Sequence, residues 1–216
     1  MAFKGWPAEA IEFYEGLEAD NTKAYWTEHK TIYEQAVRAP MTALLDDLAP
    51  EFGEAKIFRP FRDVRFSKDK SPYKTAMAAS LAGGGYVQFS SNGLGVGSGM
   101  YMMASDQLER YRAAVADDVS GTELQALIAK LGKRDIVVSG HDALKTAPKG
   151  YPRDHARIDL LRNKGLVSWQ EWPAGEWLGT SAPKKRLTDF LRACQPVNKW
   201  LAAHVGPTTL EASRWG

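Results

Sequence analysis

The sequence predicts a single α+β domain over residues 1–216, in which a mostly antiparallel, glycine-rich sheet packs with an N-terminal helical pair and a long C-terminal helix. Three observations predict this class. Helical periodicity runs through the first fifty residues and returns near the C-terminus, and glycine-punctuated runs of bulky residues lie between them. No internal repeat, low-complexity tract or obvious linker divides the chain.

The N-terminal region reads as helical. Apolar residues from Pro7 to Leu17 recur at three- and four-residue intervals, which predicts a first amphipathic helix. Asn21 is the expected N-cap of a second helix that runs to Val37. Pro40 is expected to end or kink that helix, because a proline inside a helix removes a hydrogen bond and clashes with the preceding turn.

The composition then changes to that of short strands. Bulky and charged residues alternate from Ile57 to Phe66, and three glycine-punctuated runs follow. The turn Ser91-Asn92-Gly93 between two of these runs predicts a hairpin, because Asn-Gly tolerates the positive φ angles of a tight reversal. The two strands that it joins should therefore pair antiparallel.

The remaining elements alternate between helix and strand. Gly132 is expected to end the second of two helices. In chain order we expect helices behind Ser105 and over Leu124–Leu131, a strand over Asp135–Ser139, a short helix over Asp154–Lys164, a strand over Leu166–Trp172 and a final long helix capped by Ser181.

Charge and cysteine content restrict the environment. Lys and Arg number 28 against 26 Asp and Glu, so the formal charge of +2 gives no whole-molecule attraction to nucleic acid or membrane. The lone Cys194 cannot form an intramolecular disulfide, which favours a reducing compartment. With neither a leader-like N-terminus nor 18 consecutive apolar residues, we expect a soluble cytoplasmic protein without a membrane partner.

The densest chemical feature is a basic segment, Arg59–Lys74, which holds six basic and two acidic side chains. Arginine pairs with phosphate or carboxylate through two N–H groups and lysine adds a mobile charge, so the segment has the components of an anion site. If residues 61–67 form a strand, Arg62 and Arg65 point to opposite faces. The anion-binding residues predicted here, with Tyr73 as a hydrogen-bond donor, are Arg62, Arg65, Lys68, Lys70, Tyr73 and Lys74.

The alternative for the same segment is ordinary paired surface. Asp63 and Asp69 would then neutralise the neighbouring cations, and the remaining charges would face acidic helices or solvent.

A second basic element, residues 145–157, lies directly before a predicted helix. Lys149 and Arg153 are the ligand-binding candidates here, because backbone N–H groups at a helix start favour an anion. The alternative is a basic loop in which Asp154 is an ordinary N-cap. Only the fold decides whether this element meets the first.

Other chemistries have weaker signals. The glycines between Gly83 and Gly99 lack a phosphate-loop ending and predict bulges or close backbone approach instead. No nucleophile has an evident base, and most of the tryptophans and tyrosines suit a core. The histidines show no paired metal-ligand spacing, so no metal site is predicted at His29, His141, His155 or His204.

The segment Arg62–Lys74 (RDVRFSKDKSPYK) closely resembles the signature of the domain of unknown function 2461 family. Residues 21–33 and 144–161 resemble the same family. The resemblance covers most of the chain and implies a complete single domain of the kind found in conserved hypothetical bacterial and fungal proteins. It implies no activity.

These observations leave three hypotheses. The first is a site for a small phosphorylated or carboxylated ligand, which the protein binds or acts on. The second is a nucleic-acid-binding module, against which the near-neutral total charge weighs. The third is a protein-interaction scaffold without a ligand pocket. The sequence specifies no cofactor, enzyme activity or oligomeric state.

Overall fold

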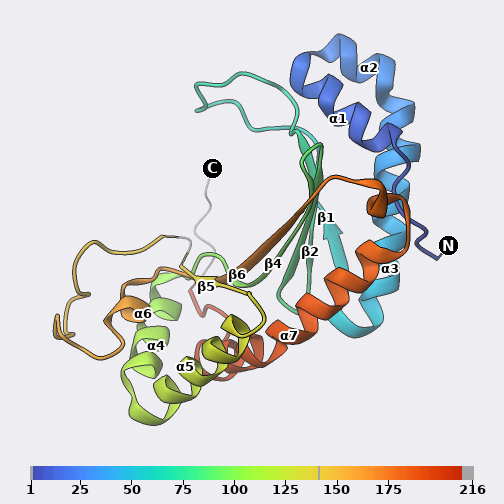
Figure 1. Ribbon diagram of the computed structural model, residues 1–216. Coiled ribbons are helices and arrows are strands. Elements are labelled where there is room, and N and C mark those ends of the chain that lie inside the picture. Colours follow the sequence, from blue (N-terminus) through green and yellow to red (C-terminus); the bar gives the residue numbers. More distant parts are fainter. Residues whose placement is uncertain (1, 141, 211–216) are drawn as a thin grey trace. The chain divides into compact units, whose positions relative to one another are not determined.

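The computed structural model describes residues 2–140 and 142–210 and has the predicted α+β fold (Figure 1). A six-stranded antiparallel sheet has the order β1-β2-β3-β4-β6-β5. The elements are α1 (Glu9–Ala19), α2 (Lys23–Ile32), a π-helical segment η1 (Tyr33–Arg38), α3 (Ala39–Phe52), β1 (Ala55–Ile57), β2 (Ala76–Leu81), β3 (Gly85–Ser90), β4 (Gly93–Met100), α4 (Ser105–Ala116), α5 (Asp118–Gly132), β5 (Val138–Ser139), α6 (Ile158–Arg162), β6 (Leu166–Pro173), a 3₁₀ turn η2 (Glu176–Gly179) and α7 (Ala182–His204).

The chain divides into two compact units. The first comprises Met1–Val96 and Glu171–Leu191, and the second comprises Gly97–Gln170 and Arg192–Gly216. Strands β4 and β6 and helix α7 each begin in one unit and end in the other. That the two units act as one domain stays a prediction.

The first helices form where the periodicity predicts them, but the cap of α2 differs. The hydroxyl oxygen of Thr22 accepts the N–H of Tyr25 at 3.2 Å, so Thr22 is the N-cap and the expectation for Asn21 is wrong. Helical structure then continues from Lys23 to Phe52 without ending at Pro40. Pro40 is the second residue of α3, which follows the π-helical segment Tyr33–Arg38.

The strands of the first unit bury one face. Met77, Ala79 and Leu81 alternate with half-exposed residues along β2, and Val87 and Phe89 do the same on β3. The ring of Trp6 stacks on Phe89, with centroids 4.5 Å apart. This face belongs to the core, and the opposite face of β2 and β3 stays partly open.

Close backbone approach explains part of the glycine content, as the sequence predicts. Gly93 has a φ of +122°, and a Cβ atom there would lie 2.2 Å from the carbonyl oxygen of Trp172. A Cβ on Gly99, whose φ is +121°, would lie equally close to the carbonyl oxygen of Leu166. Side chains at these positions would push neighbouring β4 and β6 backbone apart.

The strand predicted over residues 61–67 is wrong. β1 ends at Ile57, and the chain then forms a long loop that projects beyond β1 and β2 (Figure 1, teal). A single bridge pairs Phe61 with Tyr73 at its neck, where Pro60 and Pro72 accept the N–H groups of Lys74 and Arg62 at 2.8 and 2.9 Å. Neither proline has an N–H to donate, so strand pairing does not continue.

The neck is attached to the helices by Asn21. Its side-chain amide donates to the carbonyl of Tyr73 and its amide oxygen accepts the N–H of Tyr73, each at 3.1 Å. The Tyr73 ring also stacks on Trp26, with centroids 4.3 Å apart and planes 6° apart. Asn21 therefore acts as the missing backbone partner of the neck.

The second unit has shorter elements than the sequence predicts. β5 spans two residues, and α6 begins at Ile158, so Asp154 is not its cap. The buried Arg157 explains the late start, because its guanidinium donates to the carbonyls of Val115 and Ala116 at 2.6 and 2.9 Å. These carbonyls end α4, and the arginine replaces their missing helical partners.

We expect Gly93→Ala to lower the free energy of unfolding by about 2–3 kcal/mol, because the new methyl group meets fixed backbone at an unfavourable φ. Urea unfolding followed by circular dichroism measures the loss. Gly179→Ala is the matched control in the same unit, since its Cβ would meet only the Trp6 carbonyl oxygen at 3.5 Å. Equal stability of the two variants would contradict the close-approach interpretation.

We expect Asn21→Ala to cost about 1–2 kcal/mol, because the N–H and carbonyl of Tyr73 lose partly buried partners. Trypsin should also cleave faster after Lys68 and Lys70 as the neck opens more often. Asn92→Ala, the same change at an exposed turn position, should leave both stability and cleavage near wild type, because the φ of Asn92 is not positive and alanine fits there. Unchanged cleavage in Asn21→Ala would show that the neck does not depend on this residue.

Candidate anion-binding cleft

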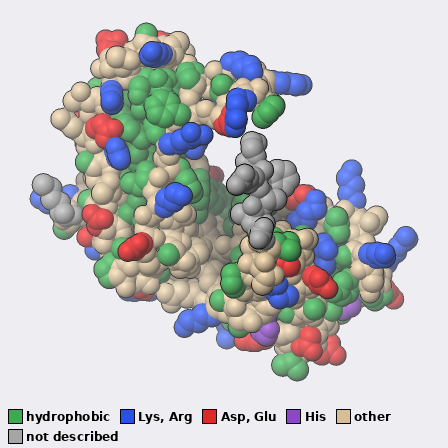
Figure 2. Space-filling model, turned by 180° about the vertical axis from the view of Figure 1, so that it is seen from behind, with side chains coloured by type: hydrophobic (Ala, Val, Ile, Leu, Met, Phe, Trp, Pro, Cys, Tyr) green, Lys and Arg blue, Asp and Glu red, His purple; other side chains and the backbone are tan. Residues whose placement is uncertain are grey.

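Most of the charged side chains of the basic segment lie on the projecting loop, where Figure 2 shows a group of Lys and Arg side chains. Arg62 is 32% exposed and forms an ion pair with Asp69, whereas Arg65 is 67% exposed and pairs with Asp63 at 2.8 Å. Lys70 donates to the carbonyl of Val64 at 3.0 Å. The predicted cation partner of Asp63 is confirmed, and the loop is partly neutralised from within.

These contacts change the acidity of the two carboxylates. Hydrogen bonds from the Arg65 side chain and backbone lower the pKa of Asp63 to about 2. Hydrogen bonds from Ser71, followed by that from Arg62, hold the pKa of Asp69 well below its usual range. Both shifts favour the charged form, so the ion pairs persist at neutral pH and are lost only as strong acid protonates the carboxylates.

A cleft of about 340 Å³ opens beside the neck, on the partly exposed face of the first unit's strands. Arg62 and Lys74 reach it from opposite arms of the neck. The remaining lining comes from the residue after β1, from β2 with the residue before it, and from β3: Phe58, Thr75, Ala76, Ala78, Tyr86 and Gln88. None of the described lining residues carries a carboxylate.

The strand register explains the shape of the cleft. Ala78 pairs directly with Gln88, so both lie on the same face, and Ala76 lies on that face two residues earlier. The alanines form a low floor beside the larger Phe58 and Tyr86, whose ring centroids are 6.3 Å apart. Sequence reasoning missed these residues, although the period-two pattern of β2 and β3 is the signal that could have identified them.

Lys74 has a different environment from Arg62. Its ammonium lies 5.8 Å from the centre of the Phe58 ring. Among the described residues, no ion pair includes Lys74. A lysine without an acidic partner at the mouth of a cleft has its charge available for a ligand.

The other predicted ligand residues lie outside the cleft lining. Arg65, Lys68 and Lys70 are exposed on the loop, and Tyr73 is buried against Trp26. Lys149 and Arg153 are exposed and belong to the second unit. Ligand contacts by these six residues stay predictions.

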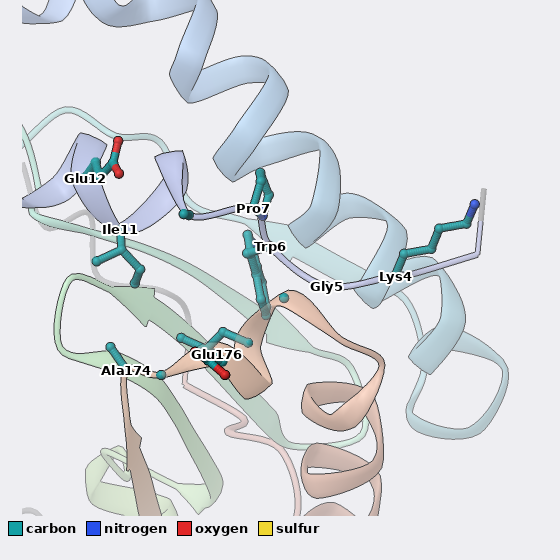
Figure 3. A pocket seen from close by; sticks show the side chains of 12 residues that line it. Lys4, Gly5, Trp6, Pro7, Ile11, Glu12, Ala174 and Glu176 are labelled. Atoms are coloured by element: carbon teal, nitrogen blue, oxygen red, sulfur yellow. The ribbon is translucent and has the colours of Figure 1, made fainter.

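A larger pocket of about 830 Å³ lies between the N-terminal segment and the η2 region of the first unit (Figure 3). Its lining is mostly backbone and apolar side chains, including Trp6, Ile11 and Leu178. Its lysine and two glutamates do not converge: Figure 3 shows Lys4 and Glu12 on opposite sides of the view. The smaller cleft is therefore the better candidate for an anion.

Two other features bear on the class of site. Over residues 2–140 and 142–210, no cluster of three or more His, Cys, Asp or Glu side chains could hold a metal ion. His141 lies outside the described residues. In the same part of the chain, every helix is too short or too polar to cross a bilayer.

Comparisons with known proteins identify a family but no activity. A search of curated proteins found no match. A conserved hypothetical protein of known structure from Pyrococcus furiosus is 11% identical, and the match covers 80% of this chain and 97% of that one at a TM-score of 0.39. Likeness at that score carries no argument about function.

The family model described as "Conserved hypothetical protein (DUF2461)" matches residues 9–200, a range that includes the Asn21 region, the whole basic segment and the cleft. The match confirms the family that the sequence analysis identified by resemblance. The chain belongs to the DUF2461 family of conserved hypothetical proteins.

Proposed function

We propose that this protein binds a small phosphorylated or carboxylated ligand in the cleft beside the loop neck. The proposal rests on one observation: Arg62 and Lys74 both line a cleft whose described lining has no acidic side chain. Arginine offers several N–H donors in a fixed plane, and lysine adds a compact mobile charge. Together they suit an anionic group with two or more oxygens.

The neighbouring ion pair supports this assignment. Asp69 accepts from one amino group of Arg62, which holds the guanidinium in place and leaves its other N–H groups for a ligand. Asn21 and the Tyr73–Trp26 stack fix the neck that carries both cations. A site held in this way loses little conformational freedom on binding, which favours affinity.

The size of the cleft supports a small ligand. Its volume of about 340 Å³ lies near the lower end of the range of about 300–1,000 Å³ found for ligand pockets. The cleft also has Phe58 and Tyr86 beside its cations, so an organic group attached to the anion would contact aromatic surface.

We expect inorganic phosphate to raise the melting temperature by about 3–5 °C at tenfold its Kd, because ligand binding to the folded state stabilises it by mass action. Differential scanning fluorimetry measures the shift, which should shrink with added sodium chloride. In Lys74→Ala the shift should fall by at least half. Lys30→Ala removes the same charge from an exposed position on α2 and should keep the full response.

Two outcomes would contradict the proposal. One is the absence of a shift with phosphate, phosphorylated metabolites and dicarboxylates alike. The other is an equal shift in wild type, Lys74→Ala and Arg62→Ala, which would place any anion elsewhere on the surface.

A second candidate function rests on Phe66. This ring is 92% exposed in the projecting loop, and the Arg65 guanidinium lies 5.9 Å from its centre. An exposed aromatic ring among cations can stack on a base while the cations contact phosphates, as in proteins that bind single-stranded nucleic acid. The near-neutral formal charge of +2 makes this the weaker candidate.

We expect only weak binding to labelled single-stranded oligonucleotides, on the order of 10⁻⁴ to 10⁻⁶ M at physiological salt. Fluorescence anisotropy at several salt concentrations measures the affinity and its salt dependence. Submicromolar binding that is lost in both Phe66→Ala and the triple variant Lys68→Ala, Lys70→Ala, Lys74→Ala would make nucleic acid the leading partner.

A further inference from the structure

The cleft has a neutral polar end as well as a cationic one. Tyr86 and Gln88 lie two residues apart on β3 and point to the same face, and the Tyr86 hydroxyl donates to the amide oxygen of Gln88 at 3.0 Å. Thr75 adds a hydroxyl from the chain entering β2. Thr75 directly follows Lys74, whereas Tyr86 and Gln88 come from β3, so the neutral end is formed by these two β3 side chains.

The hydrogen bond between Tyr86 and Gln88 determines what the neutral end offers. Because the Gln88 oxygen accepts the tyrosine proton, the Gln88 amide nitrogen presents its N–H groups. Among the described residues, no hydrogen bond is made by that nitrogen. The phenolic oxygen of Tyr86 and the hydroxyl oxygen of Thr75 can both accept, so the lining offers neutral donors and acceptors beside its cations.

Such a mixture suits hydroxyl groups better than carboxylates. A hydroxyl donates one hydrogen bond and accepts others, so it can satisfy an amide N–H and a phenolic oxygen together. A carboxylate only accepts, so at the neutral end it would bind the Gln88 N–H groups but could not donate to a hydroxyl oxygen. The floor of Ala76 and Ala78 leaves space for a carbon chain between the two ends.

The cationic end favours a phosphate over a single carboxylate. A phosphomonoester carries a charge of about −1.5 to −2 at neutral pH and has three acceptor oxygens. These oxygens can bind both the Arg62 N–H groups that do not face Asp69 and the Lys74 ammonium. A carboxylate carries one charge and two oxygens.

We propose that the cleft takes a phosphorylated polyol, with its phosphate at Arg62 and Lys74 and its hydroxyl groups at Gln88, Tyr86 and Thr75. This proposal rests on the function proposed above and specifies its ligand class. In this proposal the loop neck binds the phosphate, and the side chains on the open face of the sheet distinguish one phosphate ester from another.

The test compares two probes of equal charge and equal carbon number, glycerol 1-phosphate and n-propyl phosphate. Isothermal titration calorimetry at pH 7.5 should give about tenfold tighter binding of glycerol 1-phosphate, because each added hydroxyl finds a partner at the neutral end. In Gln88→Leu the ratio of the two affinities should fall close to one, while propyl phosphate still binds as in wild type. In Lys74→Ala both affinities should fall by a similar factor, so that the ratio is kept.

The pH dependence of binding tests separately whether the cationic end binds the phosphate dianion. Glycerol 1-phosphate should bind wild type several-fold more weakly at pH 5 than at pH 7.5, because its second ionisation near pH 6 is then reversed and the dianion is lost.

The outcomes separate the two proposals. Equal binding of both probes in wild type, with both weakened by Lys74→Ala, would overturn the polyol assignment and keep the anion site. A preference for glycerol 1-phosphate that survives in both Gln88→Leu and Tyr86→Phe would also overturn it. If neither probe binds but a dicarboxylate does, the ligand class is wrong. If no anion binds, both proposals fail.

Discussion

The candidate site depends on one interaction, the two hydrogen bonds between the Asn21 side chain and the backbone of Tyr73. Two prolines prevent the neck from extending as a strand pair, so its single bridge needs support from outside the sheet. The amide of Asn21 supplies that support, and the stacked rings of Trp26 and Tyr73 add apolar contact. The positions of both cleft cations follow from this attachment, because each lies one residue beyond the bridge.

Only some of the basic side chains of the projecting loop face the cleft, and others bind groups within the loop itself. Arg65 is held by Asp63, and Lys70 by the carbonyl of Val64. These exposed contacts contribute little to stability. Asp63 and Asp69 offset the charges of Arg65 and Arg62, whereas the contact with a neutral carbonyl leaves the charge of Lys70 in place. The charge that faces the cleft comes from Arg62 and Lys74, at the fixed end of the loop. A high density of lysine and arginine in a sequence therefore overstates the charge available to a ligand.

The open face of β2 and β3 has a composition that differs from an ordinary solvated sheet surface. Half-exposed strand positions usually carry β-branched or aromatic residues, yet Ala76 and Ala78 occupy two of them. Small residues at those positions leave a hollow between Phe58, Tyr86 and the neck. The buried face beneath is tightly filled by Phe89 and Trp6, which keeps the strands rigid under the hollow.

The sequence by itself determined the α+β class, the positions of most helices, the Ser91-Asn92-Gly93 hairpin and the local pairing of Asp63, because periodicity, turn chemistry and short-range charge are encoded within a few residues. It also indicated the family. Only the tertiary structure decided that residues 61–67 form a loop, that Asn21 binds Tyr73 rather than capping α2, and that Lys74 faces a cleft with Tyr86 and Gln88. The contacts behind these findings join residues that are up to 52 positions apart in the sequence, as with Asn21 and Tyr73, and no local sequence pattern specifies them.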